Sequence, residues 1–458
     1  MKTKKLICIV LSLLCLLPLF SRAAFAQKSD DDDKIIPTDY EIPEDENMSV
    51  DSRYALLYSE YDNRFLYSRR ADELVEPAST TKIMVGVMIF EKFADRLDTE
   101  VTITKKLTEG KEGLSVYLED DEVLTLRQLL TILLMHGAND VSTILAHYYM
   151  QDVEHNGDDL EDFAALMTAR AAELGCEKTV YKNVTGLHTQ GVKTLLSDII
   201  KIAVHAASIP GFLEMTSTDR LIIEKNGPTH YRVILSRNDL VSTYTTHDYK
   251  TPGVTGMNFG STDEMGECLL VSSEYDGKRY FAVIMGGKKD ENGVQTVYTD
   301  AKKLLEYART GFKYVDVLKK GVITTQVNVR FNSTTDVVTL VPSKTVSMYL
   351  PAGTDIKQEI TFKRIVPEKT LDAPVAEGYR AGEIIVVYND QEICRVPLVT
   401  TASVSQSKIL YTLDRLEKFV KQPVVIASFI AFFVFLILFI ILKAVIEGQR
   451  KKRKRTIK

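Results

Sequence analysis

Ser79 and Lys82 are the pair of side chains in this sequence best suited to chemistry. They stand three residues apart in the segment 77–82 (PASTTK), and the apolar residues 83–85 (IMV) follow. Residues three apart share one face of a helix, so the lysine amine can lie beside the serine hydroxyl. A base that takes its proton makes a serine hydroxyl nucleophilic, and burial can lower the pKa of a lysine enough for that task. The spacing predicts nucleophilic catalysis, but alone it also fits an N-cap serine followed by a surface lysine.

The segments around this pair predict an α/β (α+β) domain with an antiparallel central sheet. A strand at 54–59 turns back at Asp62-Asn63, and a helix begins near Ser79. Apolar periodicity predicts further helices, and strands reappear late in the segment. We therefore expect a sheet completed by both ends of the segment. The later elements are helices at 124–136, 140–149 and 160–174, strands at 267–273 and 279–285 with a turn at 275–277, and a helix at 297–312.

Beyond residue 314 the pattern changes to short strands separated by Gly, Pro, Asn and Asp. This pattern predicts a small all-β sandwich domain. A helical segment follows at 405–421. The strands are expected at 322–329, 337–341, 346–350, 359–364 and 383–388.

Both ends of the chain carry membrane signals. A basic start, an apolar run and Ala24-Phe25-Ala26 predict a signal peptide cleaved after Ala26, with an uncleaved anchor helix as the alternative. Near the other end, 424–442 is uncharged and long enough to span a bilayer, and a basic run follows. Basic residues stay on the cytoplasmic side, so the bulk of the protein is expected to be extracytoplasmic.

These observations divide the chain into seven parts. They are a signal peptide (1–26), an acidic linker (27–47), the α/β domain (48–314), the β-sandwich (315–402), a juxtamembrane helix (403–422), a transmembrane helix (423–446) and a basic tail (447–458).

Composition excludes several classes of protein. The 458 residues include 45% hydrophobic ones, enough for more than one domain core, and the formal net charge of −5 argues against a nucleic-acid partner. After the signal, Cys176, Cys268 and Cys394 remain, without the spacing of a disulfide framework or a zinc site. The scattered histidines form no recognisable ligand pair. No metal or organic cofactor is expected.

Several segments together resemble the low-molecular-mass penicillin-binding proteins, which are serine-type D-alanyl-D-alanine carboxypeptidases. The resemblance covers nearly the whole chain, including the β domain and the C-terminal membrane attachment. It is carried by the segments 76–84 (EPASTTKIM), 124–130, 133–140 (LLMHGAND), 163–167, 172–176, 183–187 (NVTGL), 253–263 (GVTGMNFGSTD) and 266–269.

The resemblance implies a DD-peptidase/β-lactamase-like fold and a set of residue roles. Ser79 would form an acyl-enzyme with a peptidoglycan peptide ending in D-Ala-D-Ala, and Lys82 would be its base. Asn139, in the second motif, would position substrate. The third motif would bind the terminal carboxylate, and backbone amides would form the oxyanion hole. β-Lactams are the expected acylating inhibitors. The third-motif residues are Asn258, Phe259, Gly260, Ser261 and Thr262.

This sequence departs from the family pattern at three positions. Gly137 stands where the second motif has serine, and Asn258 and Phe259 stand where the third has lysine and threonine. Losing a cation that meets a carboxylate removes roughly 1.5–3 kcal/mol. A displaced third motif at 250–252 is a weaker alternative, because Pro252 would interrupt strand hydrogen bonding.

Two functions remain open from the sequence. The favoured one is a membrane-anchored extracytoplasmic serine carboxypeptidase, with weakened or altered activity. The alternative is an inactive relative that binds peptidoglycan or an envelope partner, which Gly137, Asn258 and Phe259 favour. A β-lactamase is less well supported, because no deacylating carboxylate can be placed and those enzymes lack this β domain and anchor.

Overall fold

The computed structural model describes residues 34–36, 48–104, 107, 112–153, 157–245 and 247–455, with side chains to 448. The predicted signal peptide and most of the acidic linker lie outside these residues. The chain forms two compact units. One comprises 40–314 and 349–354, and the other comprises the remainder.

The first unit is built on a five-stranded antiparallel sheet with the order β3-β2-β10-β9-β8. The chain's early strands thus pair with its late ones, as the sequence predicts: Leu56 lies opposite Val283. β8 forms one edge of the sheet. The strands are β2 (Tyr54–Ser59), β3 (Arg64–Arg69), β8 (Val254–Thr262), β9 (Gly266–Tyr275) and β10 (Lys278–Gly287), and two small hairpins are formed by β4 (Glu100–Thr102) with β5 (Val123–Thr125) and β6 (Arg220–Ile223) with β7 (Arg232–Leu235).

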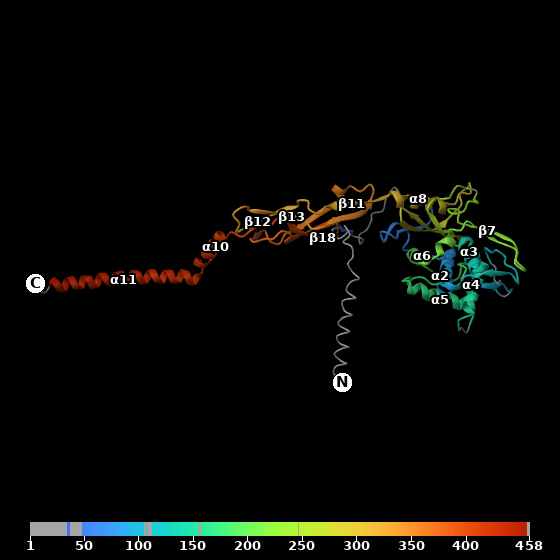
Figure 1. Ribbon diagram of the computed structural model, residues 1–458, viewed down its shortest axis with the longest axis horizontal. Helices are drawn as coiled ribbons and strands as arrows, with labels where there is room; N and C mark the ends of the chain where they lie inside the picture. Colours follow the sequence, from blue (N-terminus) through green and yellow to red (C-terminus); the bar gives the residue numbers. More distant parts are fainter. Residues whose placement is uncertain are drawn as a thin grey trace, which may run out of the picture. The chain divides into compact units, whose positions relative to one another are not determined.

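Helices cover both faces of this sheet. α8 packs on one face, and α6 packs on the other beside the remaining helices (Figure 1). Successive strand residues point to opposite faces. Leu56 and Val283 accordingly belong to the core on the α6 face of the sheet, whereas Leu57 and Ile284 belong to the core on the α8 face. The helices are η2 (Ala78–Thr80), α2 (Thr81–Phe93), η3 (Ala94–Arg96), α3 (Leu126–His136), α4 (Asn139–Met150), α5 (Asp159–Glu173), α6 (Leu196–Ser208), α7 (Phe212–Thr216) and α8 (Thr296–Thr310).

Local chemistry explains where the helices next to the site begin and end. Thr125 caps α3 through a capping box with Gln128. Gly137 ends α3 with φ of 80°, the left-handed conformation that glycine adopts without strain. α4 begins at Asn139, so a sharp turn of two residues separates the helices. The predicted helix at 297–312 was wrong at its end, because α8 stops at Thr310 and Phe312 already belongs to a strand.

The second unit contains the all-β domain that the sequence predicts. Its main sheet has the order β15-β17-β18-β13-β12-β16, antiparallel except for β12 with β16. A three-stranded sheet has the order β1-β14-β11. The elements are β1 (Lys34–Ile35), β11 (Phe312–Leu318), β12 (Thr325–Arg330), β13 (Val337–Pro342), β14 (Thr345–Pro351), α9 (Ile356–Glu359), β15 (Ile360–Ile365), β16 (Thr370–Asp372), β17 (Arg380–Tyr388) and β18 (Gln391–Thr400).

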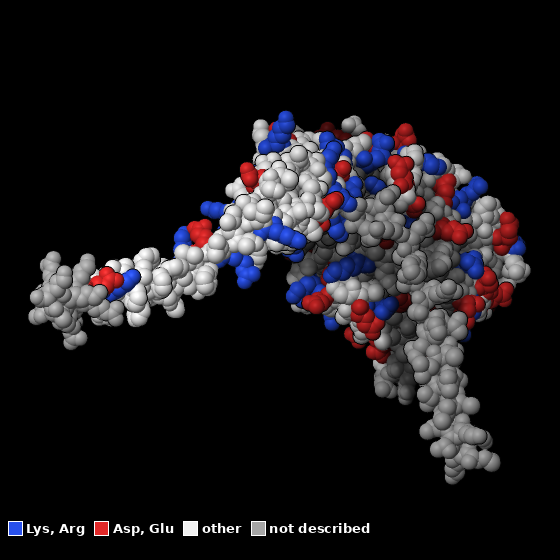
Figure 2. Space-filling view, turned by 60° about the vertical axis from the view of Figure 1, so that its left-hand side comes forward, with Lys and Arg blue, Asp and Glu red and all other residues white. Residues whose placement is uncertain are grey.

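Two helices end the described chain. α10 (Lys408–Val420) is amphipathic, and α11 (Pro423–Arg455) follows after a short turn. The part Pro423–Gly448 has a mean hydropathy of 3.3 and is long and apolar enough to cross a membrane. Figure 2 shows an uncharged stretch along this helix.

Candidate active site

The predicted nucleophile lies in a buried turn at the start of a core helix. Ser79 is the central residue of η2, which runs directly into α2, and it is 8% exposed. Ala78 before it has φ of 47°. Gly186 lies against this turn so closely that a Cβ on Gly186 would come within 1.8 Å of the Ala78 carbonyl oxygen. A side chain at position 186 would therefore displace the nucleophile's backbone.

Lys82 lies one turn further along and is buried. Its Nζ donates a hydrogen bond of 2.6 Å to the carbonyl oxygen of Thr185. Burial lowers the pKa of Lys82 to about 7, and the positive charge of Arg237 adds to this effect. A substantial fraction of the amine is therefore neutral near pH 7, as a general base requires.

The loop that binds Lys82 is itself held in place. The Asn183 side-chain oxygen accepts hydrogen bonds from the backbone N–H groups of Thr185 (3.1 Å) and Gly186 (2.7 Å). Ser142 of α4 donates a 2.5 Å hydrogen bond to the carbonyl oxygen of Val184. Residues 183–187 are among the segments that carry the family resemblance, which assigned them no role. In the structure, the carbonyl oxygen of Thr185 in this loop is the hydrogen-bond partner of Lys82.

The turn between α3 and α4 brings the second motif to the same place. Asn139 is 4% exposed, and its Nδ2 donates a 2.7 Å hydrogen bond to the Glu112 carbonyl oxygen. At Gly137 an added Cβ would lie 3.6 Å from the Phe259 carbonyl oxygen and 4.0 Å from Asn258 Nδ2. Both are ordinary contact distances, so the space beside Gly137 could accept a small side chain.

The third motif lies on β8, at the edge of the sheet. Gly260 faces the nucleophile, and a Cβ on Gly260 would be 1.9 Å from Ser79 Oγ. Asn258 is 2% exposed and does not line the cavity, unlike the four residues after it. Neither polar atom of the Asn258 side chain has a hydrogen-bond partner among the described residues.

Phe259 fills less of the cavity than its size suggests. It is 8% exposed, and the centroid of its ring lies 5.2 Å from that of the Tyr298 ring. The ring centroids of Tyr298 and Tyr249 are in turn 4.8 Å apart. Most of the Phe259 ring therefore packs within an aromatic cluster beneath α8, although part of the ring still borders the cavity.

These segments enclose a cavity of about 60 Å³. The structure therefore brings Ser79, Lys82, Gly137, Asn139 and the motif on β8 together, and it adds Arg237, which we did not predict from the sequence. Lys250 of the alternative motif is exposed in the loop before β8 and does not line the cavity. The lining residues are Ser79, Lys82, Gly113, Leu114, Gly137, Asn139, Thr185, Gly186, Leu187, Arg237, Phe259, Gly260, Ser261 and Thr262.

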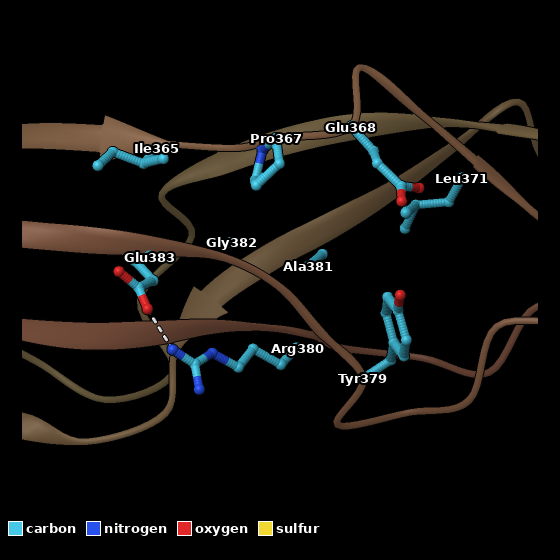
Figure 3. A pocket seen from close by; sticks show the side chains of 9 residues that line it. All are labelled: Ile365, Pro367, Glu368, Leu371, Tyr379, Arg380, Ala381, Gly382 and Glu383. Atoms are coloured by element: carbon cyan, nitrogen blue, oxygen red, sulfur yellow. Dashed lines mark hydrogen bonds and ion pairs between the residues drawn. The ribbon is translucent and has the colours of Figure 1, made fainter.

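Larger cavities exist in the β domain, but they lack comparable chemistry. One of about 360 Å³ lies beside Tyr379 (Figure 3). Its Arg380 already pairs with Glu383. Neither a serine nor a lysine lines it. The smaller cavity at Ser79 is accordingly the candidate active site.

Comparison with known sequences agrees with this assignment. The model of the D-alanyl-D-alanine carboxypeptidase family matches residues 41–289, and that of the penicillin-binding protein 5 C-terminal domain matches residues 312–406. The D-alanyl-D-alanine carboxypeptidase DacF of Bacillus subtilis is 24% identical over 380 residues, covering 80% of this chain and 90% of DacF. DacC of Escherichia coli is 25% identical over 377 residues, covering 79% of this chain and 86% of DacC.

Solved structures share the fold. The D-alanyl-D-alanine carboxypeptidase DacD from Francisella tularensis superposes with a TM-score of 0.55 at 19% identity, covering 80% of this chain and 97% of DacD. Penicillin-binding protein 6B from Escherichia coli gives a TM-score of 0.54 at 22% identity, covering 79% of this chain and 99% of its own.

Proposed function

The chain belongs to the D-alanyl-D-alanine carboxypeptidase family, and we propose that this serine carboxypeptidase removes the terminal D-alanine of peptidoglycan stem peptides through an acyl-enzyme on Ser79. One observation carries the proposal. A buried lysine with a pKa of about 7 lies one turn after a serine that faces the cavity.

The side chains support a two-step reaction. Neutral Lys82 takes the proton of Ser79 Oγ as the oxygen attacks the carbonyl carbon of the penultimate D-alanine. The peptide C–N bond breaks, and terminal D-alanine leaves as an amine after receiving a proton from protonated Lys82. Water then attacks the ester with Lys82 again as base, which releases the shortened peptide and restores Ser79.

β8 offers a way to hold the peptide during this reaction. It is an edge strand, and residues 259–262 of it line the cavity. An edge strand has unpaired backbone groups, along which an extended peptide can add as a further strand. A substrate bound there would pass Gly260, where only a glycine leaves room for Ser79 Oγ.

The altered motifs are expected to slow turnover rather than abolish it. Gly137 supplies no hydroxyl for proton relay, and Asn258 supplies no cation. Ser79, Lys82 and Asn139 remain together at the cavity. β-Lactams, which acylate serines of this kind, are the inhibitors that we expect. A protein that binds peptidoglycan without cleaving it is the second candidate, and the same substitutions favour it.

The ends of the chain support an envelope location. We propose that the signal peptide (1–26) exports the chain and that α11 anchors it, with the C-terminus in the cytoplasm. The peptidase domain (48–314) and the β domain (315–402) would then lie outside the membrane, with the β domain as a stalk. The basic residues after the apolar part of α11 support this orientation.

Release of D-alanine tests the proposed function. The full chain in detergent would be incubated with an acetylated L-Lys-D-Ala-D-Ala tripeptide, beside Ser79→Ala. Ser208→Ala, an exposed serine outside the cavity, is the matched control. We expect D-alanine from the unaltered chain and the control only. Peptide binding without D-alanine release would favour the second candidate.

A further inference from the structure

The β domain carries a surface groove that the proposed reaction does not use. Two cavities, of about 360 and 460 Å³, share Glu368, Leu371 and Tyr379 as lining residues, so they adjoin along these side chains. We call the two cavities together the Tyr379 groove. Figure 3 shows the first cavity, in which the Tyr379 ring extends toward Leu371. Each cavity has the size of a small-molecule site, which is about 300–1,000 Å³.

A local irregularity of the main sheet shapes this groove. The pairing of β17 with β18 shifts register between Arg380 and Gly382, which makes Ala381 the extra residue of a β-bulge. Gly382 lies so close to the end of β15 that an added Cβ would be 2.5 Å from the Ile365 carbonyl oxygen. Bulges redirect side chains and commonly lie beside functional sites. Here the bulge immediately follows Tyr379.

Tyr379 presents its ring from a fixed backbone. Its N–H donates 3.0 Å to Thr400 Oγ1, and its carbonyl oxygen accepts 3.0 Å from the Thr400 N–H. Thr400 is buried, whereas Tyr379 is 47% exposed. Among the described residues, none is a hydrogen-bond partner of the Tyr379 hydroxyl. An exposed tyrosine that is already held in place offers a large contact area at a low cost in conformational entropy.

The charged residues of the groove are mostly paired. Arg330 donates hydrogen bonds of 2.7 and 2.9 Å to the Asp372 carboxylate. Arg380 pairs with Glu383. Glu368 adds a carboxylate without an ion-pair partner among the described residues. The groove therefore has no excess positive charge for a polyanion, but its arginines keep further N–H donors and its carboxylates keep further acceptor sites.

We propose that the Tyr379 groove binds the glycan strand of peptidoglycan, with one sugar ring lying on the face of Tyr379. The glycan is a chain of β-linked N-acetylated sugars, and it is uncharged where its carboxyl groups are amide-linked to the peptides. The C–H groups on one face of a sugar ring pack against the negative face of an aromatic ring. The hydroxyl and acetamide groups at its edge can meet Glu368 and the paired arginines.

The groove has room for more than one sugar, because a cavity lies on each side of the residues that the two share. The choice of this glycan rests on the proposed function, since the peptides that the chain would trim are attached to it. Binding would keep the protein beside its substrate independently of the cavity at Ser79.

Calorimetric titration with chitohexaose, an uncharged oligomer of β-linked N-acetylglucosamine, tests the site. The full chain would be kept in a zwitterionic detergent, because a detergent with a sugar headgroup would compete. The variants are Tyr379→Ala, Tyr379→Phe and Glu368→Ala. Glu368 is exposed, so its substitution should not affect folding. Phe362→Ala is the matched control, because Phe362 is an exposed aromatic residue of the same sheet that lines neither cavity.

We expect Tyr379→Ala to weaken binding roughly 5- to 30-fold, the cost of truncating an aromatic anchor. Glu368→Ala should weaken it about 2- to 10-fold through the loss of a hydrogen bond. Tyr379→Phe, which keeps the ring, and Phe362→Ala should bind within about threefold of the unaltered chain. Affinity should be the same at low and high salt, since the ligand is uncharged. Absence of saturable binding, unchanged binding in Tyr379→Ala and Glu368→Ala, or an equal loss in Phe362→Ala would overturn the proposal.

The acetylated tripeptide separates this inference from the proposed function, because it contains no sugar. D-Alanine release would be measured on the same preparation of the unaltered chain. Release of D-alanine without chitohexaose binding would retain the proposed function and overturn the glycan site. Chitohexaose binding that depends on Tyr379, without D-alanine release, would uphold the glycan site and contradict the proposed function.

Discussion

The two walls of the cleft differ in how closely their residues are packed and hydrogen-bonded. The nucleophile wall comprises η2, α2 and the loop 183–187, and the substrate wall comprises β8 residues 259–262 together with Gly137. In the nucleophile wall, Lys82, Thr185 and Gly186 are fixed by hydrogen bonds or by contacts that admit no added atom. In the substrate wall, Gly137 has room beside it, and the adjoining buried side chain of Asn258 has no polar partner among the described residues.

This difference shows which parts of such a site can change. Bond formation depends on atoms held within a fraction of an ångström, so the nucleophile wall tolerates little. The attraction between a cation and a carboxylate falls off only gradually with distance, so the substrate wall can tolerate more change. Four substitutions test how far this contrast extends.

The largest effect is expected in the nucleophile wall at Lys82. Lys82→Met keeps a long buried side chain but removes the base, so acylation of Ser79 should slow by roughly 10²- to 10⁴-fold. Lys92→Met is the matched control, because Lys92 is also on α2 and its Nζ also donates a hydrogen bond, of 2.9 Å, to a backbone carbonyl oxygen, which belongs to Tyr149. Stopped-flow penicillin binding measures both. Retention of the rate within tenfold in Lys82→Met would remove Lys82 from its role.

The next effect lies where the two walls touch. Gly260→Ala would place Cβ 1.9 Å from Ser79 Oγ, so the hydroxyl must move. A displacement of about 1 Å costs on the order of 10²-fold in rate. Gly353→Ala, at a position with nothing within 4 Å of the added carbon, should leave acylation unchanged. Normal acylation in Gly260→Ala would show that the walls are less tightly packed than the structure indicates.

A smaller gain is expected from restoring the second-motif serine. Gly137→Ser should raise the acylation rate by about tenfold, a modest share of what a proton relay can contribute. The residue has φ of 80°, so the substitution should also cost about 1–2 kcal/mol of stability. Gly211→Ser, with φ of 86° and open space around it, should lower Tm similarly without the gain in rate. Unchanged or slower acylation in Gly137→Ser, despite correct folding, would refute the relay explanation.

The smallest effect is a shift in pH dependence. The base form of Lys82 exists above its pKa of about 7, so acylation should rise with pH through neutrality and level off above it. Arg237→Gln removes a repulsion that lowers this pKa, so the pKa rises and the midpoint moves to higher pH. Rate profiles from pH 5.5 to about 9.5 would show the shift. If the midpoint of the profile were the same in Arg237→Gln and in the unaltered chain, the charge of Arg237 would have no effect on the pKa of Lys82.

Local patterns allowed most of the fold to be predicted. Alternation and apolar periodicity located β2, β9, β10 and α3 because those signals lie within a single segment. β18 was not predicted, since Pro397 and several charged residues interrupt its apolar pattern. In the structure, Pro397 lies opposite Glu383 in the ladder with β17.

The candidate site was predictable only where its chemistry is local. Ser79 and Lys82 are three residues apart, so one helical turn brings them together. The partner of Lys82 is a backbone carbonyl, which residue type does not reveal, and it belongs to Thr185. Arg237 reaches the cleft through the ends of α3 and α8, and no sequence spacing encodes that contact.

Covalent labelling tests the central claim, that the nucleophile wall still works. The full chain in detergent would be treated with a fluorescent penicillin beside Ser79→Ala, and the product read by intact mass. We predict one adduct, equal in mass to the whole penicillin, on the unaltered chain and none on Ser79→Ala. Absence of an adduct on both at high penicillin, or an equal adduct on both, would contradict Ser79 as a working nucleophile.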